Sequence, residues 1–362
     1  MNLKLLIKIK FFIMKKVFLS AMALMCGTLI FAQFNNSYVN ELGSGNTSAV
    51  TQTGLSNLSH VDQIGDGNGS TVDQTGDNNN SDVDQLTYTL GTSDNNLSAV
   101  TQNGSLNDSF VWNDGDGHNS TVNQDGLSNY SYVNMWGNNS TSDVNQVGND
   151  NDSYVRQWLR TDDHISDVDQ IGDNNYSYVR QQGGNGNNSD VWQQGNGNNS
   201  SVEEYGNTNW SQVYQMGDSN DSDVLQTGDN NRSSVHQGYS FGGGYEMSND
   251  NYSWVNQLGN RNSSHTDQYG SGGSDLNNSF VDQLGDDNGS GVYQNGDMNY
   301  SDVNQTGNGN NSYVSQYGFE HISIVNQTGN LNISSVSQSG NNHYSLVDQV
   351  GNGNNSTVIQ SN

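Results

Sequence analysis

The sequence lacks several residues on which globular proteins normally rely. Its 362 residues include no proline and one cysteine, and only 30% of them are hydrophobic. All five lysines lie within the first 16 residues, so the rest of the chain sets five arginines against 38 acidic residues, a net charge near −33. A single cysteine excludes disulfides within the chain and cysteine metal sites. The scarcity of cations argues against a nucleic-acid partner.

The amino terminus has the composition of an export signal. Two lysines precede an apolar run, which gives way to polar sequence. We therefore predict a signal peptide over residues 1–32, with Met14 as an alternative start and Cys26 as part of the apolar run. No later apolar stretch approaches the roughly 20 residues that span a bilayer, so we predict no transmembrane segment in the exported chain.

Internal repetition organises everything that follows. An 11-residue unit, Asn-x-Ser-x-Val-x-Gln-x-Gly-x-x, occurs 28 times between residues 35 and 362. Its serine is constant, and its valine is replaced once, by Thr266. Its glutamine is replaced at four positions: Glu41, Asn113, Met135 and Glu204. We therefore predict one repeat domain over 35–362, without a separate cap at either end.

The spacing within the unit predicts a β-strand. The constant residues occupy every second position, so they share one face and point inward while the variable residues face solvent. Glycine followed by Asp or Asn predicts a turn, since these residues tolerate positive φ. Large aromatic residues concentrate in the odd-numbered units, which indicates a true period of 22 residues. The expected fold is an all-β, two-sheet β-solenoid of about 14 strand-turn-strand coils, uncapped and amyloid-like.

Stacking of the coils is expected to hold this fold together. One coil buries too little apolar surface to offset the entropy of ordering its residues. Stacked coils pair their backbones and place Ser on Ser and Gln on Gln, so that the amides hydrogen-bond along the axis. Representative inward residues of this structural ladder are Ser48, Val50, Gln52, Ser59, Val61, Gln63, Ser70, Val72, Gln74, Ser301, Val303, Gln305, Ser312, Val314 and Gln316.

Insertions lengthen the repeat in its turns. They lie near residues 86–95, 159–163, 238–250 and 271–275. Each follows a predicted strand, so the strands themselves are expected to stay intact. The longest insertion, 238–250, is either a hinge between two halves of the solenoid or a display loop, and loop-length statistics favour the hinge.

Catalytic and metal chemistry finds little support in the sequence. Four of the seven histidines occupy the Asn slot of the unit, where a hydrogen-bonding side chain is expected. Glu203 and Glu204 are neighbours on a strand and point to opposite faces. Gly-Asp turns would suit calcium, but they do not follow one another along one edge. We predict no catalytic residue, no cofactor and no specific metal site, and only nonspecific binding of divalent cations.

Aromatic residues on the outer face of the odd units form a possible contact stripe. Seven of the fourteen odd units carry an aromatic residue immediately before the valine. Representative members are Tyr132, Tyr154, Tyr178, Trp254 and Phe280. Exposed apolar side chains in a row usually mark contacts, so we expect lateral association or adhesion at this face.

The repeat resembles that of curlin, the subunit of curli fibres. Curlin repeats combine Ser-x5-Gln-x-Gly-x-Gly-Asn with Asn-x-Ala-x3-Gln. Residues 63–74, Gln-Ile-Gly-Asp-Gly-Asn-Gly-Ser-Thr-Val-Asp-Gln, are close to this pattern, with Ser70 in the Ala slot. The resemblance implies a secreted functional amyloid of the cell surface and the biofilm matrix. It also implies export of the unfolded chain through a dedicated outer-membrane channel, and a nucleating subunit that starts the fibre.

The main expected partner is another copy of the chain. Exposed sheet edges are normally blunted by proline or lysine, and the repeat region has neither. The first and last coils are therefore expected to template end-to-end fibre growth. We predict a self-assembling structural subunit that mediates adhesion and aggregation, and not an enzyme. The alternative is a monomeric surface β-solenoid adhesin, with calcium-binding and ice-binding solenoids less favoured.

Overall fold

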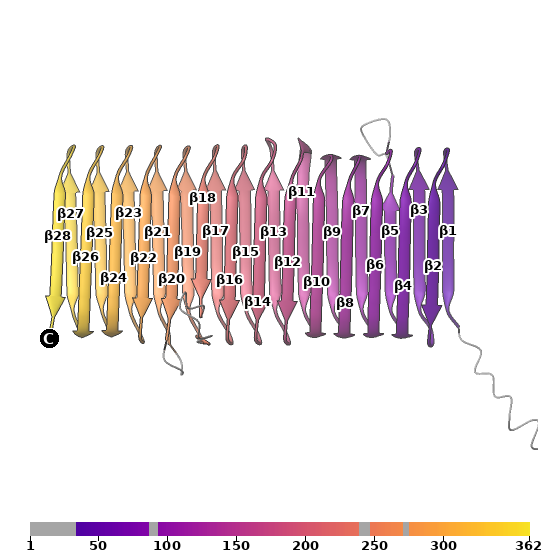
Figure 1. Ribbon diagram of the computed structural model, residues 1–362, viewed down its shortest axis with the longest axis horizontal. Helices are drawn as coiled ribbons and strands as arrows, with labels where there is room; N and C mark the ends of the chain where they lie inside the picture. The colour runs from indigo at the N-terminus through magenta and orange to yellow at the C-terminus, as the bar shows by residue number, and fades with distance from the viewer. Residues whose placement is uncertain (1–33, 87–92, 239–246, 271–274) are drawn as a thin grey trace, which may run out of the picture.

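Each repeat unit forms one strand and one turn. The computed structural model describes residues 34–86, 93–238, 247–270 and 275–362, and within these ranges the chain has 28 strands and no helix. The strands form two parallel sheets of 14. They lie across the long axis of the molecule, with the first coil at one end and the last coil at the other (Figure 1). The predicted all-β, two-sheet solenoid of 14 coils is confirmed.

Consecutive strands alternate between the two sheets, which confirms the period of 22 residues. The odd sheet contains β1 (Asn36–Leu42), β3 (Leu58–Ile64), β5 (Asn80–Gln85), β7 (Asp108–Asp116), β9 (Tyr130–Asn138), β11 (Asp152–Asp162), β13 (Tyr176–Gln182), β15 (Asn199–Tyr205), β17 (Asp221–Thr227), β19 (Tyr252–Leu258), β21 (Asn278–Leu284), β23 (Tyr300–Thr306), β25 (Ile322–Thr328) and β27 (Tyr344–Val350). The even sheet contains β2 (Thr47–Thr53), β4 (Gly69–Asp77), β6 (Leu97–Ser105), β8 (Asn119–Leu127), β10 (Thr141–Asn149), β12 (Ile165–Ile171), β14 (Asn188–Gln194), β16 (Trp210–Met216), β18 (Arg232–Gln237), β20 (Ser263–Tyr269), β22 (Gly289–Asn295), β24 (Asn311–Phe319), β26 (Ile333–Asn341) and β28 (Asn355–Ser361).

The register places like residues on like residues. In the pairing of β21 with β23, for example, Ser279 lies beside Ser301 and Val281 beside Val303. One irregularity occurs where β11 pairs with β9, between Gln157 and Thr161. This shift coincides with the insertion expected at 159–163, so the extra residues are accommodated as a local bulge and the next strand returns to register.

The core is a narrow slab between the sheets. One inward valine from nearly every strand fills it, and the column from Val61 to Val347 is buried. Serine and glutamine flank each valine on the same face and are buried as well. Because valine is the only regular apolar residue inside, the hydrophobic stabilisation per coil is modest, and hydrogen bonds between coils must supply much of the specificity.

The turns are tight because the coils approach closely there. Gly76, near the end of β4, has a φ of 113°, and Asn78, in the turn that follows, has a φ of 58°. A Cβ atom on Gly54 would lie 1.9 Å from the carbonyl oxygen of Gly76 in the next coil. Only glycine allows this approach, and its φ is in the region that favours glycine.

Most of the insertions fall on residues outside the described ranges. The predicted signal peptide, 1–32, lies entirely outside them. Insertions near 86–95, 238–250 and 271–275 lie there in part, and their described ends lie between strands. β17 pairs with β19 and β18 with β20 across the longest insertion without a change of register. Both sheets are continuous at this point, so the expectation of a hinge at 238–250 is wrong.

Candidate functional site

The predicted ladder residues line the interior. Ser59, Val61, Gln63, Ser70, Val72, Gln74, Ser301, Val303, Gln305, Ser312, Val314 and Gln316 are all buried. Ser48, Val50 and Gln52 also point inward, but they are only half-buried. The reason is their place on β2, an end strand that pairs with one neighbour among the described strands.

Glutamine side chains of the even sheet form an unbroken hydrogen-bonded column. Nε2 of Gln52 donates to Oε1 of Gln74 at 2.8 Å, and the same bond repeats from coil to coil as far as Gln360. Every amide nitrogen in the column points toward the carboxyl-terminal end. Since each bond polarises the next, such a chain is more stable than the same bonds in isolation.

The odd sheet has the same column with gaps. Met135 and Glu204 cannot donate as an amide does, and the oxygen that should accept from each of them is left without a hydrogen bond among the described residues. These oxygens are Oε1 of Gln157 and Oε1 of Gln226. Nε2 of Gln181 still donates to Glu204, at 2.8 Å. Burial raises the pKa of Glu204 well above its usual value.

A second glutamine hydrogen bond joins the two sheets, which the sequence did not reveal. Nε2 of Gln63 donates across the core to the carbonyl oxygen of Thr47 at 3.2 Å, and Nε2 of Gln74 donates to that of Leu58 at 2.9 Å. Gln85 reaches the hydroxyl of Ser98 in the opposite sheet at 2.9 Å. A long glutamine thus faces a short serine. Most inward serine hydroxyls have no hydrogen-bond partner within the described ranges, so size accounts for the constant serine better than hydrogen bonding does.

Asparagine columns tie the turns together along both edges. Oδ1 of Asn57 accepts the backbone N–H of Asn79 at 3.0 Å, and Nδ2 of Asn57 donates to the carbonyl oxygen of Gly76 at 2.8 Å. The same contacts recur from coil to coil. They explain why the repeat begins with asparagine, because only a side chain with both an acceptor and a donor satisfies the two neighbouring backbone groups.

Histidine replaces asparagine in four coils, and His118, His164 and His321 keep the acceptor role. Nδ1 of His164 accepts the backbone N–H of Asn187 at 3.1 Å, and Nδ1 of His321 accepts that of His343 at 3.2 Å. Burial lowers the pKa of His164 to about 4 and also lowers the pKa of His321. The neutral ring is the form that can accept a hydrogen bond, so these histidines serve the turn.

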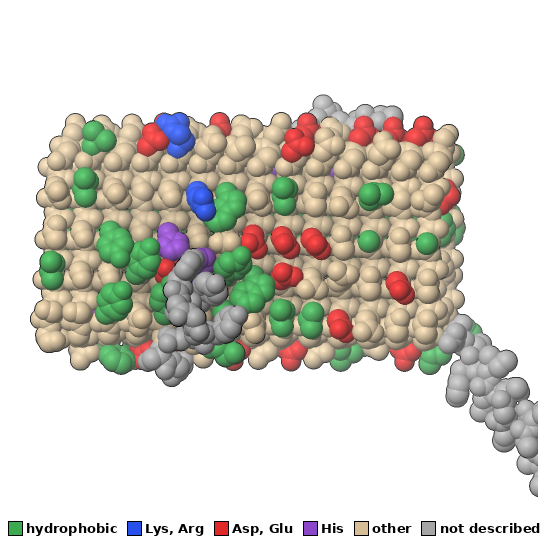
Figure 2. All heavy atoms as spheres, viewed as in Figure 1, with side chains coloured by type: hydrophobic (Ala, Val, Ile, Leu, Met, Phe, Trp, Pro, Cys, Tyr) green, Lys and Arg blue, Asp and Glu red, His purple; other side chains and the backbone are tan. Residues whose placement is uncertain are grey.

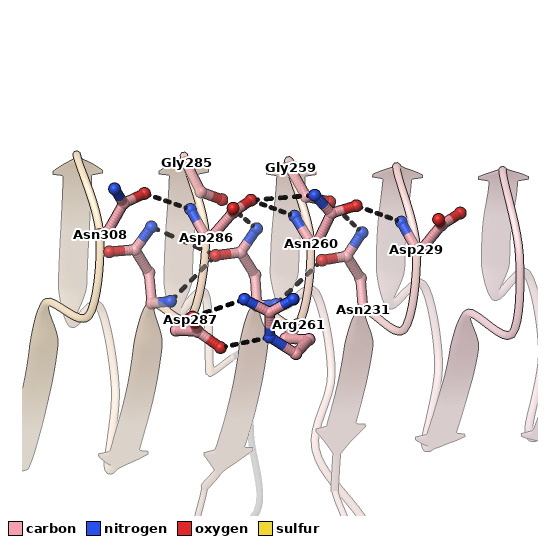
Figure 3. A network of polar contacts seen from close by, with 11 residues as sticks. Asp229, Asn231, Gly259, Asn260, Arg261, Gly285, Asp286, Asp287 and Asn308 are labelled. Atoms are coloured by element: carbon pink, nitrogen blue, oxygen red, sulfur yellow. Dashed lines mark hydrogen bonds and ion pairs between the residues drawn. The ribbon is translucent and has the colours of Figure 1, made fainter.

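The acidic turns that suggested calcium are hydrogen-bonded to the backbone. In the turns after β17, β19, β21 and β23, one side-chain oxygen per coil accepts an N–H from the coil before it (Figure 3). The N–H of Asn260 donates to Asp286, and that of Asp286 donates to Asn308, both at 2.8 Å. Aspartate and asparagine are thus interchangeable at this position, because each supplies one acceptor oxygen.

The aromatic residues of the predicted contact stripe gather in two groups. Tyr132, Tyr154 and Tyr178 occupy the same register position on β9, β11 and β13. Trp254 lies beside Phe280 on β19 and β21. The strands between these groups carry small or charged residues at that position, serine on β15 and aspartate on β17. The stripe is therefore interrupted, and all five side chains are half-buried by their neighbours.

The even sheet carries an acidic group on its outer face instead. Asp143, Asp167 and Asp190 lie side by side on β10, β12 and β14, with Asp169 next to them. Burial and the three neighbouring carboxylates raise the pKa of Asp167 to about 6. Figure 2 shows a short row of acidic side chains near the middle of the viewed face, in addition to those along the two long edges of the molecule. A cation gathered here would be held by charge alone, as expected of nonspecific binding.

Two clusters of histidine and aspartate were not recognised from the sequence. One contains His60, Asp82 and Asp84, and the other contains His236, His265 and Asp267. The histidines of both clusters lie next to the central residue of the strand and not in the Asn slot. The signal that could have revealed them is that the cluster members flank the central position on adjacent coils of one sheet. For the second cluster, this requires the pairing across the insertion at 238–250 to be known.

The two ends of the solenoid differ from its middle. β1 and β2 at one end, and β27 and β28 at the other, each pair with one strand among those described. Val50 and Val358 remain partly exposed there, although the valines of the intervening coils of the even sheet are buried. Among the described strands, one edge of each terminal coil makes no strand pairing.

These observations define a class of protein, a parallel β-solenoid whose coils are joined by internal amide columns. The model of the curlin associated repeat matches residues 56–86, 211–238, 285–318, 296–329 and 334–361. Two of these matches are offset by one 11-residue unit. The chain carries the repeat of the curlin family, as the resemblance in its sequence predicted.

The remaining comparisons add two facts. No curated protein matches the chain. Within the described ranges, no helix has the length and apolar character needed to cross a membrane. The curlin repeat and the solenoid are structural in character, and together they fit a curli-like structural subunit.

Proposed function

We propose that the chain is a secreted, curli-like subunit that polymerises end to end into extracellular amyloid fibres. The observation that carries this proposal is that the first and last coils present the same columns that pair throughout the interior. In this proposal the fibres form part of a biofilm matrix and support adhesion, and export proceeds through an outer-membrane channel with a nucleating subunit.

The geometry of the two ends supports head-to-tail joining. If β2 of a second copy paired with β28 in the register of the repeat, Ser48 would lie beside Ser356, and Val50 beside Val358. The amide column runs in one direction, from Oε1 at the amino-terminal end to Nε2 at the carboxyl-terminal end. The nitrogen of Gln360 would then donate to the oxygen of Gln52, so the column would continue between molecules.

The odd sheet gives an equivalent match. A second copy would place Glu41 on β1 beside Gln349 on β27. The same arrangement exists inside the chain, where Gln181 donates to Glu204 at 2.8 Å. The high negative charge outside opposes this association, so added salt should speed fibre growth by screening it.

Seeded growth tests the proposal. Purified chain, diluted from denaturant with and without preformed seeds, should form fibres that bind thioflavin and diffract at about 4.7 and 10 Å. Val358→Lys places a charge on the inward face of the last strand and should block addition at that end. Ile359→Lys, one residue further on the outer face, is the matched control and should elongate like the wild type.

The outcome separates this proposal from its rival. A folded monomer that ignores seeds would overturn the fibre proposal and favour a monomeric surface adhesin. Equal elongation by V358K and I359K would also contradict it, because the inward column at the carboxyl-terminal end would then play no part in growth.

A further inference from the structure

Three metal-binding side chains meet on the outer face of the even sheet. His236 follows the central valine of β18, and His265 and Asp267 flank the central threonine of β20, the next strand in the sheet. One ligand atom from each residue lies within 4.8 Å of the other two. Histidine side chains are seen on the viewed face beside hydrophobic ones (Figure 2).

The carboxylate of Asp267 joins the two imidazole rings. Its Oδ1 lies 3.0 Å from Nδ1 of His236, and its Oδ2 lies 2.9 Å from Nε2 of His265. The ring planes are nearly perpendicular, at 85°. A tetrahedral Zn²⁺ site with bonds of about 2.0–2.2 Å holds its ligand atoms about 3.3–3.6 Å apart. The two separations in the cluster are about 0.3–0.7 Å shorter than that spacing, so a bound ion would move these side chains slightly apart.

Contacts behind His236 hold its ring in place. The amide nitrogen of Gln212 donates to Asp190 and to Tyr214, so its Oε1 is directed at Nε2 of His236, 3.5 Å away. The hydroxyl of Ser234 lies 3.1 Å from the same nitrogen. Partners of this kind on the outer nitrogen commonly orient a metal-bound histidine, and they leave Nδ1 facing Asp267.

The cluster is largely buried. The side chains of His236 and Asp267 are each 5% exposed, and that of His265 is 31% exposed. The partial exposure of His265 leaves a route for an ion.

The position of the cluster gives the site a structural role. His236 and Asp267 are 31 residues apart, whereas paired residues in uninterrupted coils are 22 apart. The longest insertion accounts for the difference. The entropy lost on closing a loop grows with its length. A bond that joins β18 to β20 therefore stabilises the solenoid more than the same bond would between two coils joined by an ordinary turn.

We propose that His236, His265 and Asp267 bind a divalent transition-metal cation of the Zn²⁺ class, which ties β18 to β20 across the longest insertion. Two imidazole nitrogens and one carboxylate are a ligand set that such ions prefer, and Ca²⁺ and Mg²⁺ prefer oxygen ligands alone. The His60 cluster has one histidine and two half-exposed aspartates, so it suits these ions less well.

Metal titration of the purified full chain tests the proposal. The chain should bind one equivalent of Zn²⁺, and Co²⁺ at the same site should give visible absorption bands of a four-coordinate ion. Asp267→Asn and His265→Asn should each weaken binding about 100-fold or more, since each removes a direct ligand. His60→Asn, which removes an imidazole from the other cluster, is the matched control and should bind like the wild type.

Circular dichroism of each variant keeps the result interpretable. H265N changes a partly exposed residue, so it should retain the sheet signal even if D267N does not. No bound equivalent in the wild type, unchanged binding by folded H265N, or loss of the equivalent in H60N would overturn the proposal. None of these readouts depends on fibre growth, so the metal site and the proposed function fail or stand separately.

Discussion

The two sheets share one repeat and one register, yet they differ in how strictly they keep their interior amide column. The even sheet has a glutamine in every coil and an unbroken chain of hydrogen bonds from Gln52 to Gln360. The odd sheet departs at Glu41, Asn113, Met135 and Glu204. The solenoid therefore needs one continuous column, and the second tolerates gaps.

Aromatic packing compensates for the gaps in the odd sheet. On the outer face of β9, the strand that carries Met135, the ring centroid of Tyr130 lies 5.2 Å from that of Tyr154 and 5.9 Å from that of Phe110. Tyr132 lies 6.3 Å from Tyr154. Such ring pairs contribute about 0.5–1.5 kcal/mol each beyond their buried area. Amides hold the coils together from inside in both sheets, and in the odd sheet the ring pairs lie outside the strands next to the gap at Met135.

Breaking the even column should have the largest effect. Gln193→Met removes the donor to Gln215 and the acceptor for Gln170, and it leaves both partners buried. We expect a loss of about 2–4 kcal/mol, since each orphaned polar group costs about 1–3 kcal/mol. Guanidinium denaturation measures it. Gln194→Met, the same change on the outer face of the same strand, is the control, and an equal loss there would refute the role of the column.

Repairing the odd column at Glu204 should have the next largest effect and should depend on pH. Burial raises the pKa of Glu204 in the folded chain, so folding takes up a proton between the ordinary value of 4.5 and the raised one. The contribution of Glu204 to stability is therefore greatest below pH 4.5, falls as the pH rises through this window, and stays low above it. Glu204→Gln should remove this contribution to the pH dependence.

At neutral pH the same substitution should raise stability by about 1–3 kcal/mol, because the new amide can donate to the unpaired oxygen of Gln226. Denaturation curves recorded from pH 4 to pH 8 measure both effects. Glu203→Gln removes one negative charge from the outer face of the same strand, together with its ion pair to Arg180, so it controls for loss of charge without repair of the column. A pH slope in E204Q as steep as that of the wild type would contradict the assignment.

Removing a ring from the odd sheet should have a smaller effect. Tyr154→Ser deletes contacts with Tyr130, Tyr132 and Tyr176, and we expect a loss of about 1–2 kcal/mol. The control is Tyr313→Ser in the even sheet, where the ring contacts Tyr293. A larger loss in Y313S than in Y154S, measured by thermal unfolding, would contradict the idea that outer rings matter more where the column is broken.

Restoring the amide at Met135 should have the smallest effect. Met135→Gln supplies a donor to the unpaired oxygen of Gln157 and loses some apolar contact. The net gain should be about 1 kcal/mol. Met216 is also buried but lies outside the column, so Met216→Gln should destabilise the chain. Chemical denaturation of the two variants gives the comparison, and a loss of stability in M135Q would argue against it.

Periodicity alone was enough to predict the architecture of this chain. A constant residue at every second position identifies the strands, and the unequal distribution of aromatics between alternate units identifies the 22-residue coil. The inward columns follow from these two facts. Both depend on short-range spacing, which a repeat displays many times over.

Contacts between the sheets and across insertions could not be predicted in the same way. The bond from Gln63 to the carbonyl of Thr47 depends on how far apart the sheets pack, which no spacing in the sequence records. His236 and Asp267 come together because the register continues past residues 238–250. The expectation of a hinge at 238–250 was wrong for the same reason. The spacing within the repeat does not record that the pairing of β17 with β19 and of β18 with β20 continues past this insertion.

The uniform coil has a consequence for kinetics. Each coil docks on the previous one through the same valine contacts and nearly the same amide contacts. In the proposed fibre, folding of a monomer and elongation are then a single reaction, distinguished only by the covalent link that supplies the next coil. That link gives every following coil an effective concentration on the order of millimolar. A chain of many coils therefore needs one slow bimolecular encounter, after which its remaining coils dock rapidly. The number of repeats then sets the length of proposed fibre that each encounter adds.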